Sequence, residues 1–480
     1  MKTSFNIARL KFALVATIFL ASCSKNFLEI DPKQDTNANI AVVDLPTMKA
    51  ALNGIYSQLQ SEDYYGRTFI VAPELLSNNG MLSVINSARY TNINLNTVVS
   101  TDTHITGLWN VLYCTAINAN LLISNGEQLS FSGANLTTSR QYLGEAYALR
   151  ALAYFDLVRA FAQPYDQTAD ASHLGVPLVL ESGISKEDIA KPARNTVAEV
   201  YKSIIDDLEK AIMLFASQSP QSPSYLGLNG AKALLSRVYL YQGDWPNAER
   251  LATEVIGSGK YQLLSNTSLL SNFKVKANPE VIFEVANNTA DNAGTGSLAY
   301  FCMQAGYGDM IGTEDLYNNY SATDVRRAFV TKAKRDRVGG ENPAYVISKY
   351  TEISTYEENI KVIRLAEVYL IRAEARARQI GKESLAQDDL FLVASRGDIN
   401  AIRSTSSGTL LINEILKERR KELAFEGHQL FDLNRTRTNW TKFRSNDGTT
   451  AYTARSNRTI FPIPRRETSL NPNIRQNTGY

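Results

Sequence analysis

Residue types that perform catalysis occur in this sequence, but their spacing matches no catalytic or metal-binding motif. The three histidines, His104, His173 and His428, are scattered, and no H-E-x-x-H or C-x-x-C pattern is present to bind a metal. No G-x-S-x-G elbow of a serine hydrolase occurs, and the segment Gly257-Ser258-Gly259-Lys260 lacks the glycine spacing of a phosphate-binding loop. We therefore predict no catalytic residue, no metal site and no cofactor, and a protein that is not an enzyme.

One pair of carboxylates has a spacing worth testing for glycoside hydrolysis. Glu418 and Glu422 lie four residues apart on a predicted helix. Glycoside hydrolysis needs two carboxylates that flank the scissile bond, and two groups one turn apart on one helix face do not readily do so. Because Arg419, Arg420 and Lys421 lie between them, the pattern favours a salt-bridged structural helix.

The N-terminus has the layout of a secretory signal peptide. Three basic residues precede an uncharged run from Phe12 to Leu20, which is shorter than the roughly 20 apolar residues that span a membrane. The quartet Leu20-Ala21-Ser22-Cys23 is similar to a bacterial lipobox, in which Cys23 is acylated. The alternative is an ordinary cleavage site that precedes a cysteine. We predict a signal peptide over residues 1–22 and a lipid-anchored polar tether over residues 23–46.

The remaining composition is that of a large globular domain. The 480-residue chain is 44% hydrophobic, and no other run approaches membrane-spanning length. Fifty basic and 48 acidic residues leave a net charge of +2 without long blocks of one sign, which argues against nucleic acid as a partner. Cys114 and Cys302 lie among apolar residues and are predicted to be buried, with a disulfide between them left open. We predict one domain over residues 47–480.

Helical periodicity predicts a mainly α fold. Apolar residues form a broad stripe from Gly144 to Phe161. Thr196 and Glu199 form a capping box that begins another helix. A further helix runs from Ala231 to a break at residues 243–246, beyond which a second helix continues to Ile256.

This break has the pattern of a tetratricopeptide repeat. Gly243, Trp245 and Ala248 match the turn between paired helices, and the segment from Leu365 to Ala377 begins a second pair of the same style. Stacked helix pairs bury one continuous core. The fold class that we predict is a tetratricopeptide-like helix-pair core with long loops and short β-strands.

Two segments interrupt this helical pattern. Residues 61–103 and 287–320 are rich in Asn, Ser, Gly and Tyr and show little periodicity, and a short strand is predicted at Val281 to Val285. Long loops in a compact domain are usually functional or disordered, and the tyrosines argue against disorder. We interpret both segments as ligand-binding loop insertions.

Several motifs occur in order along the whole chain. The C-terminal part carries E-R-R-K-E-L-A-F-E-G at 418–427, D-L-N-R at 432–435, P-I-P at 462–464 and N-P-N-I-R-Q-N-T-G-Y at 471–480. Upstream motifs are Trp109, Tyr113, Ile117 and Asn120 on one helix, then Gly144-Glu145-Ala146 with Arg150-Ala151 and Tyr154-Phe155, and Gly175-Val176-Pro177-Leu178. Together they resemble the SusD/RagB family of outer-membrane nutrient-binding lipoproteins.

The resemblance implies a lipoprotein on the cell surface of a Bacteroidetes outer membrane. It implies a helix-pair core of the SusD-like type with ligand-binding loops on one side, and no catalysis. The implied partner is a SusC-like TonB-dependent transporter, to which the protein delivers an oligosaccharide or, in some members, a peptide. A protein-interaction scaffold without a nutrient ligand is the alternative from another class.

Ligand-binding residues are predicted in the two loop insertions, because sugars bind against aromatic faces and hydrogen-bond to planar polar side chains. The asparagine pair stands where family members often carry an acidic pair. The candidates are Asn78, Asn79, Arg89 and Tyr90 in the first insertion, and Tyr300, Tyr307 and Asp309 in the glycine-rich second insertion.

The three tryptophans are assigned to other segments, at Trp109, Trp245 and Trp440. A tryptophan platform for a sugar is therefore missing. Its absence favours a small, charged or peptide ligand more than the family resemblance by itself does. An oligosaccharide held by tyrosines stays the leading hypothesis.

Overall fold

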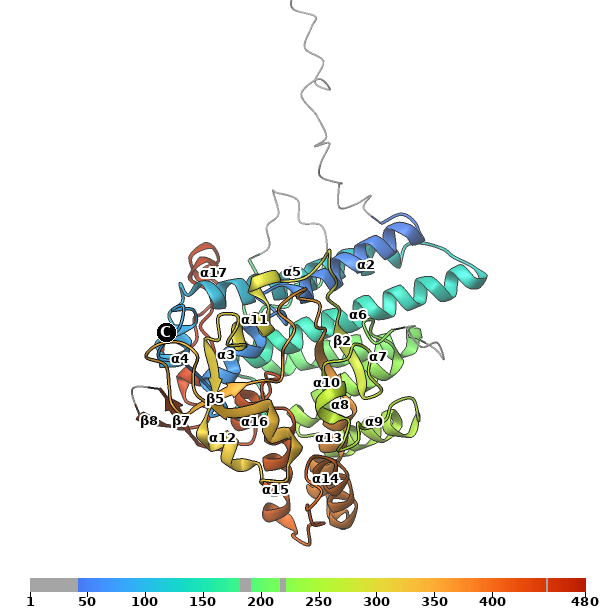
Figure 1. Ribbon diagram of the computed structural model, residues 1–480. Coiled ribbons are helices and arrows are strands. Elements are labelled where there is room, and N and C mark those ends of the chain that lie inside the picture. The colour runs from blue at the N-terminus through green and yellow to red at the C-terminus, as the bar shows by residue number, and fades with distance from the viewer. Residues whose placement is uncertain (1–41, 182–190, 216–221, 446–447) are drawn as a thin grey trace, which may run out of the picture.

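The computed structural model describes residues 42–181, 191–215, 222–445 and 448–480 (Figure 1). The predicted signal peptide, Cys23 and most of the predicted tether lie outside these residues. The α-helices are α2 (Leu45–Gln60), α3 (Thr68–Leu76), α4 (Thr91–Leu95), α5 (Thr103–Gly126), α6 (Gly133–Phe161), α7 (Val197–Phe215), α8 (Leu228–Gln242), α9 (Trp245–Gly257), α10 (Leu269–Phe273), α11 (Leu298–Cys302), α12 (Glu314–Asn319), α13 (Leu365–Ala377), α14 (Glu383–Gly397), α15 (Gly408–Glu422), α16 (Gln429–Arg435) and α17 (Arg465–Leu470).

The strands are short and form antiparallel pairs. The pairs are β1 (Gly80–Leu82) with β3 (Met310–Gly312), β2 (Val281–Val285) with β6 (Ile360–Arg364), β4 (Val330–Ala333) with β5 (Ala344–Ile347), and β7 (Trp440–Arg444) with β8 (Gly448–Tyr452). The predicted strand at Val281 to Val285 is confirmed as β2.

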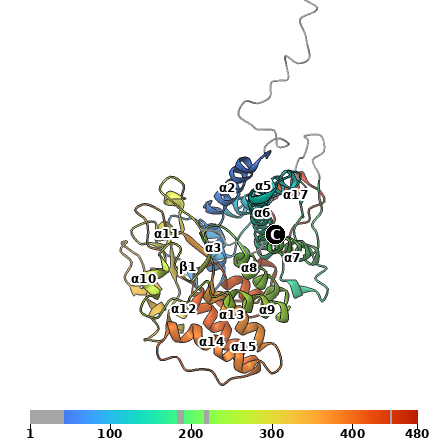
Figure 2. The ribbon, with the colours of Figure 1, turned by 90° about the vertical axis from the view of Figure 1, so that its right-hand side faces the viewer.

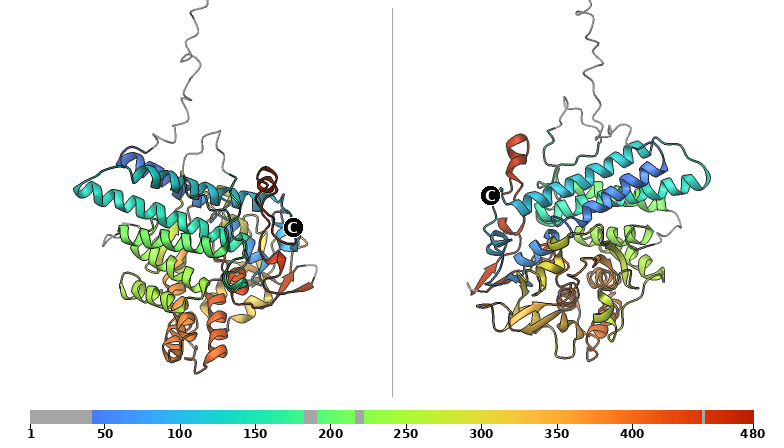
Figure 3. Two further views of the ribbon diagram at one scale, coloured as in Figure 1. Left: turned by 180° about the vertical axis from the view of Figure 1, so that it is seen from behind. Right: turned by 45° about the horizontal axis from the view of Figure 1, so that its top comes forward.

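Successive helices stack against one another in the order of the sequence. Helix α6 packs on α5 and α7, α8 packs on α7 and α9, and α13 packs on α9, α14 and α15. Seen from behind in Figure 3, the stack runs from the long α5 and α6 helices through α7, α8 and α9 to α14 and α15. The predicted mainly α fold with a helix-pair core is confirmed.

Local sequence signals explain where the helices begin and end. The amide of Glu199 donates to Thr196 Oγ1 over 3.2 Å, and the Glu199 carboxylate accepts from the amide of Thr196, so the predicted capping box of α7 is present. Gly243 has φ of +85°, which ends α8, and Asp244 caps α9 by accepting from the amide of Asn247.

The prediction that residues 61–103 and 287–320 form long loops is wrong in part. Helix α3 lies in the first segment, and all nine of its residues are buried. Because α3 is buried on every side, its sequence TFIVAPELL lacks the amphipathic periodicity that signals a surface helix. The second segment contains α11, β3 and α12. Figure 2 shows α11, β1 and α10 on one side of the molecule and α7, α8 and α9 on the other.

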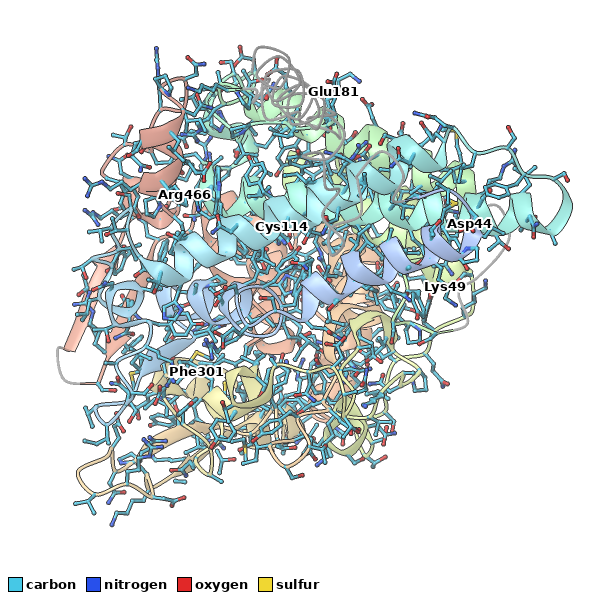
Figure 4. The ribbon with its side chains drawn as sticks, turned by 90° about the horizontal axis from the view of Figure 1, so that it is seen from above. Asp44, Lys49, Cys114, Glu181, Phe301 and Arg466 are labelled. Atoms are coloured by element: carbon cyan, nitrogen blue, oxygen red, sulfur yellow. The ribbon has the colours of Figure 1, made fainter. Side chains whose placement is uncertain are left out.

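Both described cysteines are free thiols. Cys302 is buried as predicted, whereas the prediction of burial is wrong for Cys114, which is exposed. Cys114 lies on the outer face of α5. In Figure 4, Cys114 and Phe301, the neighbour of Cys302, lie on separate helices. Within the described ranges, no helix is both long and apolar enough to cross a membrane.

A buried network of ion pairs joins the segments around β2, β4 and β6 to helices α14 and α15. Glu422, at the end of α15, pairs with Arg326 over 2.8 Å, with Arg364 over 2.9 Å and with Arg396. Arg364 also pairs over 2.6 Å with Glu280 and with Glu426. All six side chains are buried. Although burial raises the pKa of the Glu422 carboxyl, Arg396, Arg364 and Arg326 hold that pKa far below its usual value.

The Glu422→Gln substitution tests this network. Because three buried guanidinium groups lose their shared carboxylate, we expect the free energy of unfolding to fall by about 3–5 kcal/mol. The matched control is Glu414→Gln on the exposed side of the same helix, where we expect a loss below about 1 kcal/mol. Urea denaturation at pH 7 measures both variants. Equal losses in the two variants would contradict a central role for Glu422.

Candidate functional site

Helix α11 and the short loop that follows it present one tyrosine ring each, Tyr300 on the helix and Tyr307 on the loop; we call residues 303–309 the tyrosine loop. The amide of Tyr307 donates to the carbonyl of Tyr300 over 2.8 Å, and the amide of Asp309 donates to the carbonyl of Phe301 over 2.9 Å. The chain folds back this tightly because Gly306 has no side chain: a Cβ there would lie 2.3 Å from the Tyr300 carbonyl oxygen. The rings of Tyr300 and Tyr307 meet edge to face at 4.9 Å and are both partly exposed.

The structure brings the first predicted cluster to the second. Strand β1 pairs with β3, with Leu82 opposite Met310, and the amide of Ser83 continues the pairing by donating to the carbonyl of Asp309. Because of this register, the residues that follow β1, including Arg89, lie beside the tyrosine loop. There the Arg89 guanidinium lies over the ring of Tyr307, 4.0 Å from its centroid.

Asp309 lies beneath this contact and is fully buried. Its carboxylate accepts hydrogen bonds from the amide and from the hydroxyl of Ser87, and Ser87 Oγ accepts from Arg89 over 2.7 Å. Asp309 therefore orients Arg89 through Ser87 and does not face solvent itself.

Tyr90 is likewise buried and lies below the surface residues. Its hydroxyl accepts from Arg67 Nε over 2.8 Å, and its ring stacks on His104 at 3.9 Å and meets the edge of Phe301 at 5.2 Å. Phe301 is labelled in Figure 4 on α11. Burial raises the pKa of Tyr90 and lowers the pKa of His104, so both rings are neutral at pH 7.

The asparagine pair contacts the C-terminal helices and none of the residues of the tyrosine loop. Asn79 is fully buried, accepts from Arg420 Nε over 2.8 Å and donates to Glu74 over 2.9 Å. The side-chain oxygen of Asn78 accepts from Gln429 over 3.0 Å. Both ends of the Asn79 amide are thus bonded within the protein, as is the side-chain oxygen of the half-buried Asn78. The sequence prediction grouped them with Arg89, and the structure separates them from it.

Two residues that the sequence did not single out belong to the same surface. The ring of Tyr356 lies 5.9 Å from the ring of Tyr300, and Tyr356 has φ of +60°, a conformation that L-residues rarely adopt. Arg337 donates to the carbonyl of Gly306 over 3.0 Å. No local sequence signal separates this tyrosine from the others of the chain. Positive φ at a partly exposed aromatic residue is a feature that only the structure reveals.

We call Arg89, Tyr300, Tyr307 and Tyr356 the tyrosine cluster. Its three rings come from α11 and from two separate loops and are all partly exposed, and Arg89 adds hydrogen-bond donors. Such a surface has the chemistry to bind a ring-shaped polar ligand by stacking and hydrogen bonding. Within the described residues, no group of three or more His, Cys, Asp or Glu side chains is arranged to hold a metal ion.

Two family models together match most of the chain. Residues 336–480 match the model of the SusD family, and residues 26–240 match a SusD-like model described as starch-binding and associating with the outer membrane. A crystal structure of a protein described as sugar-binding, from Bacteroides vulgatus, superimposes with a TM-score of 0.83 at 30% identity, covering 92% of this chain and 99% of that one.

The chain belongs to the SusD family. A curated relative, the SusD-like protein P38 of Formosa agariphila, is 26% identical over 426 residues, which cover 78% of this chain and 79% of the relative. A laminarin-binding SusD-like protein of known structure shares the fold, with a TM-score of 0.72 at 24% identity and coverage of 92% of this chain and all of that one.

In this SusD-family chain, the E-R-R-K-E-L motif is structural. Arg419 pairs with Asp432 over 2.7 Å, Arg420 holds Asn79, and Glu422 is the centre of the buried network. The predicted salt-bridged helix is therefore confirmed. The residues that identify the family are separate from the partly exposed tyrosine cluster.

The Gly306→Ala substitution tests how the tyrosine loop is held. Because the new Cβ would collide with the Tyr300 carbonyl, we expect the amides of Tyr307 and Asp309 to lose their bonds and to exchange hydrogen at least about tenfold faster. Hydrogen exchange with mass spectrometry measures this change. The control is Gly257→Ala, where a Cβ meets no atom within 4 Å. Unchanged exchange in residues 300–309 of the Gly306 variant would show that the loop is held by other contacts.

Proposed function

We propose that this protein captures an oligosaccharide at the tyrosine cluster and delivers it to a SusC-like TonB-dependent transporter in the outer membrane. The ligand contacts in this proposal are Arg89, Tyr300 and Tyr307, with Tyr356 added. Capture proceeds by binding alone, and no reaction is catalysed.

The observation that carries the proposal is the convergence of three partly exposed tyrosine rings from α11 and two loops. Apolar C–H faces of a pyranose pack against aromatic faces, and sugar hydroxyls hydrogen-bond to the phenol and guanidinium groups. Tyr300 and Tyr307 are nearly perpendicular, at 83°, so one ring presents a face where the other presents an edge. This geometry suits a ligand with both apolar faces and a polar rim.

The remaining predicted residues, of which Asn79, Tyr90 and Asp309 are buried and Asn78 is half-buried, have supporting roles in this proposal. Asp309 fixes Ser87 and Arg89, and Tyr90 packs under Phe301. Asn78 and Asn79 attach the start of β1 to α15 and α16. They maintain the shape of the ligand surface without touching the ligand.

The comparisons support a carbohydrate as the ligand class. One family model is described as starch-binding, and a relative with the same fold binds laminarin, a glucose polymer. The description of association with the outer membrane supports the proposed location and the membrane transporter as partner. Acylation of Cys23 is the proposed means of attachment.

Binding of oligosaccharides tests the capture step. The chain from Ser24 onward is titrated by calorimetry with starch-, laminarin- and xylan-derived oligosaccharides and with mixed short peptides. We expect saturable binding to an oligosaccharide and a loss of about five- to tenfold in affinity for Tyr307→Ala, since one ring contact contributes about 1 kcal/mol.

Tyr225→Ala is the matched control, because Tyr225 is 38% exposed and packs against Tyr56, outside the tyrosine cluster. We expect its affinity to equal that of the wild type. Binding of peptides alone would replace the oligosaccharide with a peptide ligand. Association with partner proteins in the absence of any small ligand would favour the scaffold alternative.

The Cys23→Ala substitution tests the anchor and the delivery step. Without the acylated thiol, we expect the protein to leave the membrane fraction for the soluble fraction, which cell fractionation and immunoblotting measure. In mild detergent, the wild-type protein is expected to co-isolate with a TonB-dependent transporter. A variant that stays membrane-bound would contradict lipid anchoring, and a wild-type protein that elutes alone would contradict delivery.

A further inference from the structure

Two guanidinium groups from separate loops flank the same dipeptide of the tyrosine cluster. Arg89 lies over the ring of Tyr307 at 4.0 Å, and Arg337 donates from Nη2 to the carbonyl of Gly306 over 3.0 Å. Both side chains are partly exposed. Arg89 uses Nη1 to bind Ser87, and the ion pairs among the described residues include none for Arg89 or Arg337. Their remaining N–H groups are therefore available to a ligand.

The carboxylates near these two arginines are almost all committed to other partners. Asp309 is buried and accepts two hydrogen bonds from Ser87. Glu341 accepts from the amide of Val84 over 2.7 Å and from Ser83 Oγ over 2.8 Å. The exposed carboxylate on this loop is Asp336, and Lys334 is also exposed two residues before it.

A guanidinium group binds a carboxylate or a sulfate by parallel, charge-assisted hydrogen bonds, which are stronger than hydrogen bonds to a neutral hydroxyl. An arginine already held flat on an aromatic ring loses little conformational freedom when it binds such an anion. Arg89 meets this description, because Ser87 and the Tyr307 ring hold its head group.

We infer that the ligand of this site is an anionic oligosaccharide, bearing a uronic acid carboxylate or a sulfate ester that Arg89 and Arg337 bind together. This inference rests on the proposed capture function and names the chemical class of its ligand. The absence of tryptophan from the cluster agrees with it, because charge-assisted bonds then supply affinity that a larger aromatic platform would otherwise provide.

The charged side chains around the tyrosine cluster differ between its two ends, with arginines beside Tyr307 and carboxylates near Tyr356 in the chain. At the other end, Tyr356 is flanked by carboxylates, with Glu352 accepting from the amides of Ser354 and Thr355 and Glu357 pairing with Lys276 over 3.4 Å. Carboxylates supply no hydrogen-bond donors to an anionic group, whereas Arg89 and Arg337 do. The acidic sugar therefore lies at the Arg89 end, and the rings of Tyr300 and Tyr356 receive a neutral part of the same chain.

The experiment compares matched oligosaccharides by calorimetry at 20 mM and 300 mM NaCl: oligogalacturonate for the carboxylate, a sulfated galactan oligosaccharide for the sulfate, and a neutral galactan oligosaccharide of the same length. We expect one anionic ligand to bind at least about tenfold more tightly than the neutral one at low salt, and the added salt to reduce this preference. The carboxylate and sulfate arms identify which anion is bound.

Three substitutions distinguish a specific contact of Arg89 with the anion from a general effect of the protein's net charge. Arg89→Gln is expected to weaken anionic binding about tenfold and neutral binding only about two- to threefold, because a neutral sugar loses an ordinary hydrogen bond where the anion loses charge-assisted ones. Asp336→Asn, which removes the exposed carboxylate, is expected to strengthen anionic binding two- to threefold. Arg140→Gln, an equal loss of charge at an exposed position on α6, is expected to change neither.

Each outcome is informative. Anionic preference that Arg89→Gln removes and Arg140→Gln retains supports the inference. Neutral binding that depends on Tyr307 and is equal to anionic binding overturns the inference and leaves the capture function intact. If no oligosaccharide binds and Tyr307→Ala changes nothing, the capture function fails and the inference fails with it.

Discussion

The shape of the ligand-binding side depends on one buried structure, the ion-pair network at the end of α15. Glu422 joins three arginines that come from the segment before β4, from the end of β6 and from α14. Arg420, two residues before Glu422 on the same helix, extends this role, because it holds Asn79 immediately before β1. Strand β1 pairs with β3, which follows the tyrosine loop. A continuous series of contacts therefore runs from α15 to Tyr300 and Tyr307.

Buried charged side chains are an energetically costly way to connect these segments. Removing an ion pair from water costs several kcal/mol per ion, and a packed apolar cluster would often give equal stability. Ion pairs, however, require particular partners at particular distances. Arg364, for example, lies 2.6 Å from both Glu280 and Glu426 and 2.9 Å from Glu422, so small displacements of β6 against α15 break several bonds at once. We interpret the network as a means of fixing the relative position of the helix stack and the loops that carry the ligand surface.

Much of the helical core could be predicted from the sequence, and less of the site. The capping box at Thr196 and the turn at Gly243 are local signals, and both are present. Helix α3 was missed because burial on all sides removes its amphipathic pattern. Asn79 was grouped with Arg89 because its partner Arg420 lies 341 positions away along the chain. Arg89, Tyr300 and Tyr307 were named from their residue types and their place in the two predicted loop insertions. Their meeting, and the contribution of Tyr356, depend on strand pairing and backbone conformation that local sequence does not encode.

A crystal structure of the protein with its tightest-binding oligosaccharide is the most direct test of the claim that the tyrosine cluster is the ligand site. The account predicts sugar rings packed against Tyr300 and Tyr307, an acidic group beside Arg89, and an unchanged path of contacts from α15 through β1 and β3. A ligand bound elsewhere, such as in the open groove that Ile402, Glu414 and Lys417 line beside α14 and α15, would contradict it.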